Sequence, residues 1–294
     1  MTPRRWQADL ALAGVALIWG STFVLVKQAL DEVSTALFIA VRFGIAAVVL
    51  GVVYRLRGGQ SHIGGAWKGG VLAGIFLFTG YLLQTLGLKL NTPAKSGFIT
   101  GLYVPLIPVL VAVVYRRLPL VSECAGIALA AVGMGLMTLN FDQIAIGSGD
   151  ALTFGCAVAF AVHMLLLGHY STRIDTTWLA FLQIATCAAL AGFSIPWLEE
   201  PRLILSGGVI VAIAVTSLLG TALAFFVQTW GQRHTTTTRT ALIFALEPVF
   251  AWLTSYFFAG ERLTSQAIVG AACILSGILL VELKPGSARA AQAV

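Results

Sequence analysis

Long apolar runs make up most of the chain, and short polar segments separate each run from the next. A helix needs about 20 apolar residues to cross a bilayer. The alternation of polar and apolar residues that marks β strands is absent, and a helix satisfies its own backbone hydrogen bonds in lipid. We therefore predict an all-α integral membrane protein with ten transmembrane helices, at about residues 9–30, 35–54, 69–88, 96–115, 123–140, 150–168, 177–197, 206–229, 240–258 and 264–283.

The composition narrows the class further. Fifty-eight per cent of the 294 residues are hydrophobic and 10% are charged, whereas about a quarter of the residues in a soluble domain are charged. This excludes a soluble enzyme, a disordered chain and a disulfide-stapled secreted fold. The sequence contains no HExxH motif and no phosphate-binding loop, so it predicts neither a metal site nor a cofactor. The cysteines form no CxxC pair, and we interpret them as small core residues: Cys124, Cys156, Cys187 and Cys273.

The distribution of basic residues predicts an orientation. The net charge is +6, but the basic residues lie in short loops and form no stripe of the kind that binds nucleic acid. If the N-terminus is cytoplasmic, 12 Lys and Arg residues lie on the cytoplasmic side, 4 lie outside, and Lys27 and Arg42 lie within spans. Because cytoplasmic loops carry the excess of basic residues, we expect both termini in the cytoplasm of a multi-pass protein of the bacterial inner membrane.

The two halves of the sequence resemble each other. At an offset of 141, Asp9 meets Asp150, Trp19 meets Phe160, Thr22 meets His163 and Arg42 meets Gln183. Further along, the offset becomes 144, and the segment 83–87 (LQTLG) then meets 227–231 (VQTWG). We predict a first five-helix repeat at 1–145 and a second at 146–294. Since five is an odd number, the second repeat enters the membrane from the opposite side. Inverted repeats of this kind build many secondary transporters, whose binding sites lie near the midplane between the repeats.

Five short motifs lie within or next to the predicted spans. They are WGSTF at 19–23, RF at 42–43, GLYVP at 101–105, LEPVF at 246–250 and GERL at 260–263, followed by Gly270 and Gly277. Together these motifs resemble the EamA family of the drug/metabolite transporter superfamily over about residues 9–283.

The resemblance is strongest to the YddG-type exporters of aromatic and other amino acids. It implies a basket-like bundle of ten helices with a central cavity lined mainly by spans 1, 3, 4, 6, 8 and 9. Two inverted repeats can exchange conformations, so the architecture itself predicts alternating access through one central site. The resemblance also implies a small-molecule substrate, most simply a neutral amino acid, and a monomer or weak homo-oligomer in a lipid bilayer. Members of the superfamily that move drugs, sugars or nucleotide precursors keep other substrates open.

Polar residues next to aromatic ones are the candidates for the cavity wall. The pair Trp19 and Thr22 recurs as Phe160 and His163, and Tyr81 and Gln84 recur as Phe225 and Gln228. An amide that faced lipid would leave its donors unpaired, so we expect these faces to point inward. Each of these residues can equally serve helix packing alone. The predicted substrate-binding set is Trp19, Thr22, Tyr81, Gln84, Tyr103, Phe160, His163, Phe225, Gln228, Phe244 and Glu247.

Three charged residues fall inside the predicted spans away from the first and last two residues of each span, where a charge is expensive. Lys27 lies close to the outer end of its span and can reach the interface, or it can belong to an outer gate. For Arg42 we favour a structural role, such as bonding to backbone carbonyls. Glu247 precedes Pro248, which opens the carbonyl ladder. It can bind an ammonium group, carry a proton, or serve structure alone, for example as a partner of Arg42.

The sequence lacks the features that three other functions would need. The GxGD segment at 147–150 is found in intramembrane aspartyl proteases, but that chemistry needs two opposed carboxylates, and no second Asp lies within a span. A channel would need a continuous polar stripe or a filter sequence, which is not visible. A scaffold would need docking loops, and the loops here are short. We expect a transporter rather than an enzyme.

Overall fold

Thirteen α-helices and one π-helix make up the described chain. The computed structural model describes residues 5–58, 67–91, 93–116, 118–138, 147–259 and 264–283. The helices of the first half are α1 (Arg5–Ala29), α2 (Thr35–Leu56), α3 (Trp67–Leu90), α4 (Pro93–Gly101), α5 (Tyr103–Tyr115) and α6 (Val121–Thr138). Those of the second half are α7 (Ser148–Ser171), α8 (Thr176–Leu198), α9 (Gly207–Ser217), η2 (Leu218–Leu223), α10 (Ala224–His234), α11 (Thr237–Phe244), α12 (Glu247–Ala259) and α13 (Ser265–Leu283).

The ten predicted spans are confirmed, and the fold is two inverted five-helix repeats. Within the described residues the only β contact is an isolated bridge between Val33 and Leu203. Seven segments are long and apolar enough to cross a membrane, and α6 and α13 contain shorter apolar helices. The proposed boundary between residues 145 and 146 and the GERL segment at 260–263 lie outside the described residues.

Three spans are not the continuous α-helices that we predicted. Span 4 breaks at Leu102 into α4 and α5, and span 9 breaks at Ala245 and Leu246 into α11 and α12. Proline explains both breaks, because it donates no backbone hydrogen bond to the carbonyl four residues earlier. Pro105 and Pro248 thereby free the carbonyls at the ends of α4 and α11. In span 8, η2 inserts a stretch of π-helix between α9 and α10.

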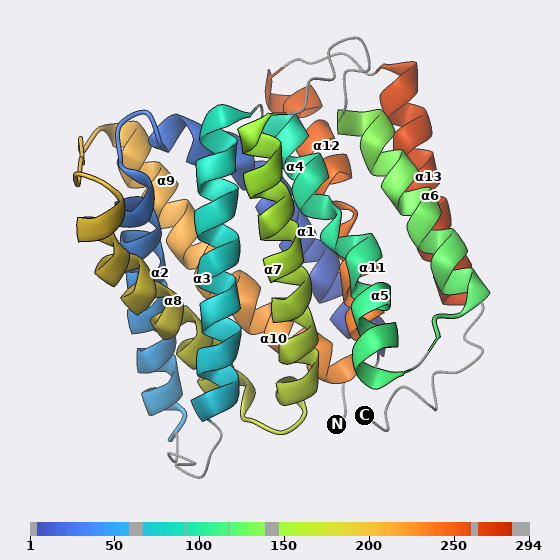
Figure 1. Cartoon of the computed structure of the whole chain (residues 1–294), viewed down its shortest axis with the longest axis horizontal. Coiled ribbons are helices and arrows are strands. Elements are labelled where there is room, and N and C mark those ends of the chain that lie inside the picture. The colour runs from blue at the N-terminus through green and yellow to red at the C-terminus, as the bar shows by residue number, and fades with distance from the viewer. Residues whose placement is uncertain are drawn as a thin grey trace.

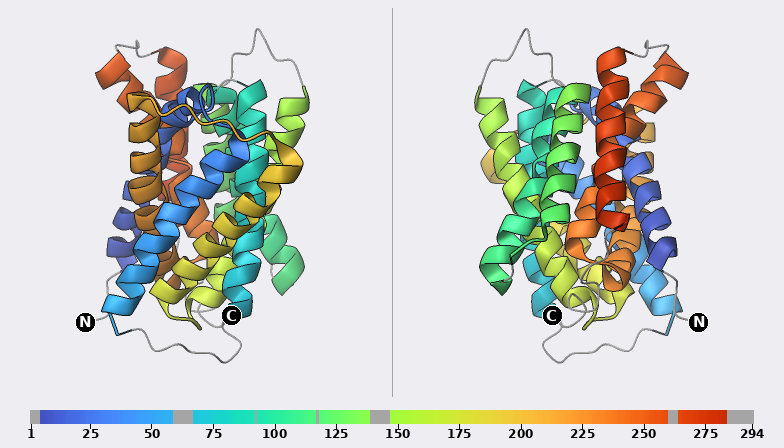
Figure 2. Two further views of the ribbon diagram at one scale, coloured as in Figure 1. Left: turned by 90° about the vertical axis from the view of Figure 1, so that its left-hand side faces the viewer. Right: turned by 90° about the vertical axis from the view of Figure 1, so that its right-hand side faces the viewer.

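The helices form a bundle with paired helices at each edge. In Figure 1, α2 and α8 stand at one side and α6 and α13 at the other, while α1, α3, α7 and α10 fill the middle. Figure 2 shows these two edges face on. Along the edge formed by α6 and α13, a Cβ added to Gly133 would meet the carbonyl oxygen of Gly270, and one added to Gly277 would meet that of Gly126. These glycines therefore let α6 and α13 pack closely against each other.

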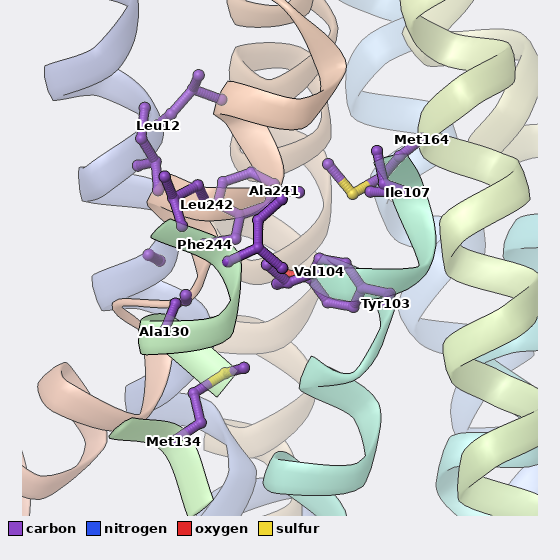
Figure 3. Close-up of a cluster of buried hydrophobic side chains, with 14 of the residues drawn as sticks. Leu12, Tyr103, Val104, Ile107, Ala130, Met134, Met164, Ala241, Leu242 and Phe244 are labelled. Atoms are coloured by element: carbon purple, nitrogen blue, oxygen red, sulfur yellow. The ribbon is translucent and has the colours of Figure 1, made fainter. Parts of the chain in front are cut away.

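The two ends of the bundle differ in which helix termini they carry. Helix α1 begins and α13 ends at the same end (Figure 1), which we call the terminal end; α3 ends and α7 begins at the opposite end, the far end. A large cluster of buried apolar side chains lies among α1, α5, α6, α7 and α11 (Figure 3). Three of its members, Leu12, Ile107 and Leu242, lie in the half of the bundle that is nearer the terminal end.

Candidate functional site

A cavity lies in the middle of the bundle, between the two repeats. It encloses about 740 Å³ of space not filled by protein atoms, part of which is continuous with solvent. Its wall comes from α1, α3, α4, α5, α7, α10, α11 and α12, with Arg42 added from α2. These helices belong to spans 1, 3, 4, 6, 8 and 9, as the family resemblance implied.

The cavity extends from mid-depth toward the far end. Its wall continues along α1 to Val26 and along α3 to Leu88, both within one turn of the ends of these helices. In the other direction, Leu12, Ile107 and Leu242 are buried members of the apolar cluster and come from the parts of α1, α5 and α11 in the half nearer the terminal end. Packed apolar side chains therefore lie on the terminal side of the cavity.

All eleven residues of the predicted substrate-binding set line this cavity. The aromatic–polar pairs of both repeats thus face the same space, although the repeat-related pairs lie 141 and 144 residues apart in the sequence. Their role in binding stays a prediction. The sequence analysis missed other residues of the wall: Phe23, Val26, Leu77, Thr85, Leu88, Thr100 and Met164. The helical spacing could have revealed several of them, since Phe23 and Val26 continue the face of Trp19 and Thr22 at intervals of three or four residues.

Aromatic rings form a continuous surface on the cavity wall. Trp19 lies 5.3 Å from Phe225 and 5.0 Å from Phe244 between ring centroids, and Tyr81 lies 5.3 Å from Phe160. These separations are typical of edge-to-face and tilted aromatic pairs. The rings support one another across both repeats and offer an apolar surface to a ligand.

Arg42 is 4% exposed and reaches the cavity from α2. Its Nε donates to Oγ1 of Thr221 at 2.7 Å, and its Nη2 donates to the carbonyl of Gly220 at 3.2 Å and to the hydroxyl of Tyr81 at 3.4 Å. The guanidinium also lies 4.9 Å from the centre of the Tyr81 ring, close enough for a cation–π interaction. The predicted bonding of Arg42 to a backbone carbonyl is confirmed.

The π-helix η2 provides the atoms that hold Arg42. A π-helix shifts the carbonyl register, and such segments are frequent at functional sites. The carbonyl of Gly220 accepts from the indole Nε1 of Trp19 at 2.8 Å as well as from Arg42. The sequence analysis did not predict the π-helix. Its one signal in the sequence was the Gly220-Thr221 pair in the middle of an apolar span.

Glu247 begins α12 at the break in span 9. The hydroxyl of Tyr103, which begins α5 at the break in span 4, donates to Oε1 of Glu247 at 3.3 Å. The interpretation that Glu247 pairs with Arg42 is wrong: among the described residues, neither forms an ion pair. Both charges instead border the same cavity.

His163 is buried, and its Nε2 lies 2.7 Å from Oε1 of Gln183. The amide of Gln183 in turn donates to Oγ1 of Thr229 at 3.1 Å. His163 and Gln183 occupy the repeat positions of Thr22 and Arg42, so the second repeat holds a hydrogen-bonded histidine–glutamine pair where the first holds Thr22 and the guanidinium of Arg42.

The two repeat-related glutamines differ in their bonding. Gln84 donates from Nε2 to Oγ1 of Thr100 at 3.3 Å. Gln228 is 2% exposed and donates to Oε1 of Gln232 at 3.4 Å, whereas its own Oε1 is buried and has no hydrogen-bond partner. An unpaired buried acceptor costs about 1–3 kcal/mol, and this one belongs to a side chain that lines the cavity.

Lys27 lies outside the cavity wall. Its Nζ donates to the carbonyls of Leu88 at 2.5 Å, Lys89 at 3.2 Å and Asn91 at 3.3 Å. These are the last carbonyls of α3 and the residue after it, which a helix leaves unpaired. Lys27 therefore joins the far ends of α1 and α3, and an outer-gate role for it stays a prediction.

Two ion pairs connect the repeats, one at each end of the bundle. At the far end, Nζ of Lys95 lies 2.8 Å from Oδ2 of Asp150. At the terminal end, Arg239 binds Asp9 with two hydrogen bonds of 3.0 and 2.6 Å. Lys95 and Arg239 are repeat mates, as are Asp9 and Asp150, so the two pairs are related by the inverted symmetry. Asp150, the aspartate of the GxGD segment, is engaged by Lys95, and no group of metal-binding side chains occurs in the described part of the chain.

Comparison with known proteins identifies the family. The EamA-like transporter family matches residues 6–139 and again residues 147–283. The chain belongs to the EamA-like transporter family. Two family matches follow one another along the chain, in keeping with the repeat that the sequence shows. The members of the family are transporters, which agrees with the expectation that this chain is not an enzyme.

Similar proteins extend over nearly the whole chain. A protein of Archaeoglobus fulgidus named an uncharacterized transporter is 36% identical, covering 96% of this chain and 87% of its own length. The uncharacterized transporter YyaM of Bacillus subtilis is 25% identical, covering 92% of both chains. A solved crystal structure superimposes with a TM-score of 0.79 at 22% identity, covering 94% of this chain and 98% of the other, and it supports the fold alone.

One shorter match carries a substrate in its name. A probable terminal-alkyne amino-acid exporter of Streptantibioticus cattleyicolor is 32% identical over 77 residues, 26% of this chain and 26% of its own length. This EamA-like protein is thus a multi-pass membrane transporter of a small molecule.

Proposed function

We propose that this EamA-like transporter exports small neutral amino acids, aromatic ones among them, by alternating access through the central cavity. The observation that carries the proposal is the cavity itself, which lies between two inverted repeats and combines an aromatic surface with a cation, a carboxylate and two amides. An amino acid presents the matching groups: an ammonium, a carboxylate and an apolar side chain. The partial similarity to an amino-acid exporter supports the same class.

The ion pairs at the two ends support alternating access. Each pair joins one repeat to the other, and the cavity lies between the two pairs. Both pairs are formed in this structure; in our proposal, opening of the pair of Lys95 and Asp150 widens access from the far side, and opening of the pair of Asp9 and Arg239 admits the terminal side. Because the repeats are inverted copies, each can adopt the conformation of the other, and the two pairs then exchange roles.

The orientation and the site residues are part of the proposal. The excess of basic residues near the terminal end supports a cytoplasmic location for both termini, in the inner membrane of a bacterium. The eleven residues of the predicted substrate-binding set form the binding surface, the repeats meet near residues 145 and 146, and the protein acts as a monomer or weak homo-oligomer.

Counterflow in proteoliposomes tests the substrate class. Vesicles containing the purified protein are loaded with unlabelled phenylalanine, methionine or threonine, and uptake of the labelled amino acid is measured over time. We expect saturable uptake that depends on the internal substrate. Uptake of a sugar or a cationic drug without uptake of any amino acid would reject the proposal, and transport that neither saturates nor responds to internal substrate would indicate a channel.

A further inference from the structure

Two opposite charges border the same cavity without meeting each other. Arg42 comes from α2 and Glu247 from the beginning of α12, and among the described residues neither has a charged partner. Charges held away from water are normally paired, because an unpaired one is costly. The cavity therefore offers a positive group and a negative group that a ligand can pair at the same time.

The free atoms of Arg42 point to a carboxylate. Its Nε and Nη2 are occupied by Thr221, Gly220 and Tyr81, while Nη1 makes no hydrogen bond within the described part of the chain. The guanidinium is thus held in place by two of its nitrogens and keeps the third available. Guanidinium groups form strong charge-assisted hydrogen bonds with carboxylates.

The free atoms near Glu247 point to an ammonium group. Tyr103 donates to Oε1 of Glu247, and Oε2 accepts no hydrogen bond from the described residues. The buried Oε1 of Gln228 also lacks a donor. Both side chains line the cavity. An ammonium has three donors, and the carboxylate of Glu247 and the amide oxygen of Gln228 are acceptors that no other group in the described chain satisfies.

We propose that the cavity binds its ligand in one direction: the α-carboxylate at Arg42, and the α-ammonium at Glu247 and Gln228. The side chain of the ligand then lies against the aromatic surface of Trp19, Phe160 and Phe225. This inference rests on the proposed function and deepens it, since it assigns the ligand as a zwitterion. A ligand that carries only one of the two charges leaves either Arg42 or Glu247 unpaired, so the site rejects simple amines and simple acids of the same size.

Three ligands with the same aromatic ring test the orientation. Phenylalanine carries both charges, phenethylamine lacks the carboxylate, and 3-phenylpropionate lacks the ammonium. Dissociation constants are measured for the purified full-length protein in detergent. We expect the wild type to prefer phenylalanine over each analogue by at least about tenfold, since each analogue leaves one charge of the cavity without its partner.

Two variants then separate the two charges. Glu247→Gln keeps the size of the side chain and removes its charge, so the preference for phenylalanine over 3-phenylpropionate should fall at least fivefold while the preference over phenethylamine stays. Arg42→Gln should produce the converse pattern. Lys89→Gln, at an exposed position at the end of α3, is the matched control and should change neither ratio. If Arg42→Gln does not fold, the two ratios of Glu247→Gln decide alone.

The outcomes separate this inference from the proposed function. Equal affinities of the wild type for the three ligands, or unchanged ratios in folded Glu247→Gln, overturn the inference even when phenylalanine is transported. The converse assignment, in which Glu247→Gln alters only the phenethylamine ratio, overturns it as well. Failure to bind or transport any amino acid rejects the proposed function, and the inference falls with it.

Discussion

Tyr103 and Glu247 occupy the same position in the two repeats and are joined by a hydrogen bond of 3.3 Å. Each is the first residue after a break in its span, and 144 residues separate them. The inverted symmetry therefore brings both broken spans together at the cavity. The hydroxyl and the carboxylate that follow the two helix breaks therefore both face the cavity.

Removing the hydroxyl of Tyr103 should weaken substrate binding without preventing folding. A hydrogen bond to a charged group contributes about 1.5–3 kcal/mol when it is well formed, and this one is long, so we expect Tyr103→Phe to raise the KM for phenylalanine about threefold to tenfold. Initial rates of counterflow measure the change. Tyr115→Phe, in the last turn of the same helix and outside the cavity wall, is the control. An unchanged KM in Tyr103→Phe would show that the hydroxyl does not hold Glu247 for the substrate.

The two glutamines of the repeated QTxG segment should matter for transport. We expect Gln84→Ala and Gln228→Ala to reduce the rate of phenylalanine counterflow while the proteins insert into the membrane normally. The larger effect should belong to Gln228, because its buried Oε1 has no partner in the described chain and we propose it as an acceptor for the ligand, whereas Gln84 is bonded to Thr100. Membrane insertion is measured by quantitative immunoblot of the membrane fraction. Wild-type kinetics in both variants would remove the glutamines from the binding surface.

Breaking one of the two ion pairs should open the corresponding end of the bundle. The side chains of Lys95 and Asp150 are 26% and 11% exposed, and a partly exposed pair contributes up to about 1 kcal/mol. Asp150→Asn should therefore increase the population open at the far end by about twofold to fivefold. Asp9→Asn should have the opposite effect, because it breaks the symmetry-related pair with Arg239.

Accessibility labelling can measure this change. A cysteine introduced at Val26, on the far side of the cavity, is labelled with a membrane-impermeant maleimide after replacement of Cys124 and Cys273 by alanine. The other two native cysteines are buried. We expect faster labelling in Asp150→Asn and slower labelling in Asp9→Asn. Identical rates in both variants would contradict the assignment of the pairs to the two ends, and the charge reversal Lys95→Asp with Asp150→Lys should restore the original rate.

A methyl group at the contact of α6 and α13 should destabilise the protein. The Cβ of Gly133→Ala would lie against the backbone of Gly270 and 2.9 Å from the amide nitrogen of Ile274, and overpacking of this kind costs about 1–3 kcal/mol. Gly44→Ala, in α2, is the matched control, since nothing lies within 4 Å of its added Cβ. Thermal unfolding in detergent should show a Tm lowered by several degrees in Gly133→Ala and not in Gly44→Ala. Equal Tm values in the two variants would contradict the close packing.

Sequence reasoning located most of the cavity wall for a physical reason. A polar side chain in a span needs a partner or a watery space, so residues such as Gln84, Gln228 and Glu247 mark the inward faces of their helices. Residues without such a signal, such as Leu77 and Met164, were missed because an apolar side chain suits lipid, core and cavity equally well.

The sequence by itself determined the ten spans and the inverted repeat, because the bilayer sets the length of each span and duplication leaves matching residues at nearly equal offsets, 141 and then 144. Only the tertiary structure decided how the charges are arranged. It placed Lys95 against Asp150 and Arg239 against Asp9, and it held Arg42 on the π-helix at Gly220 and Thr221, away from Glu247. These contacts join segments 55 to 230 residues apart. Only the packing of the helices brings such segments together, because no local pattern of polar and apolar residues specifies which distant partner a buried charge will meet.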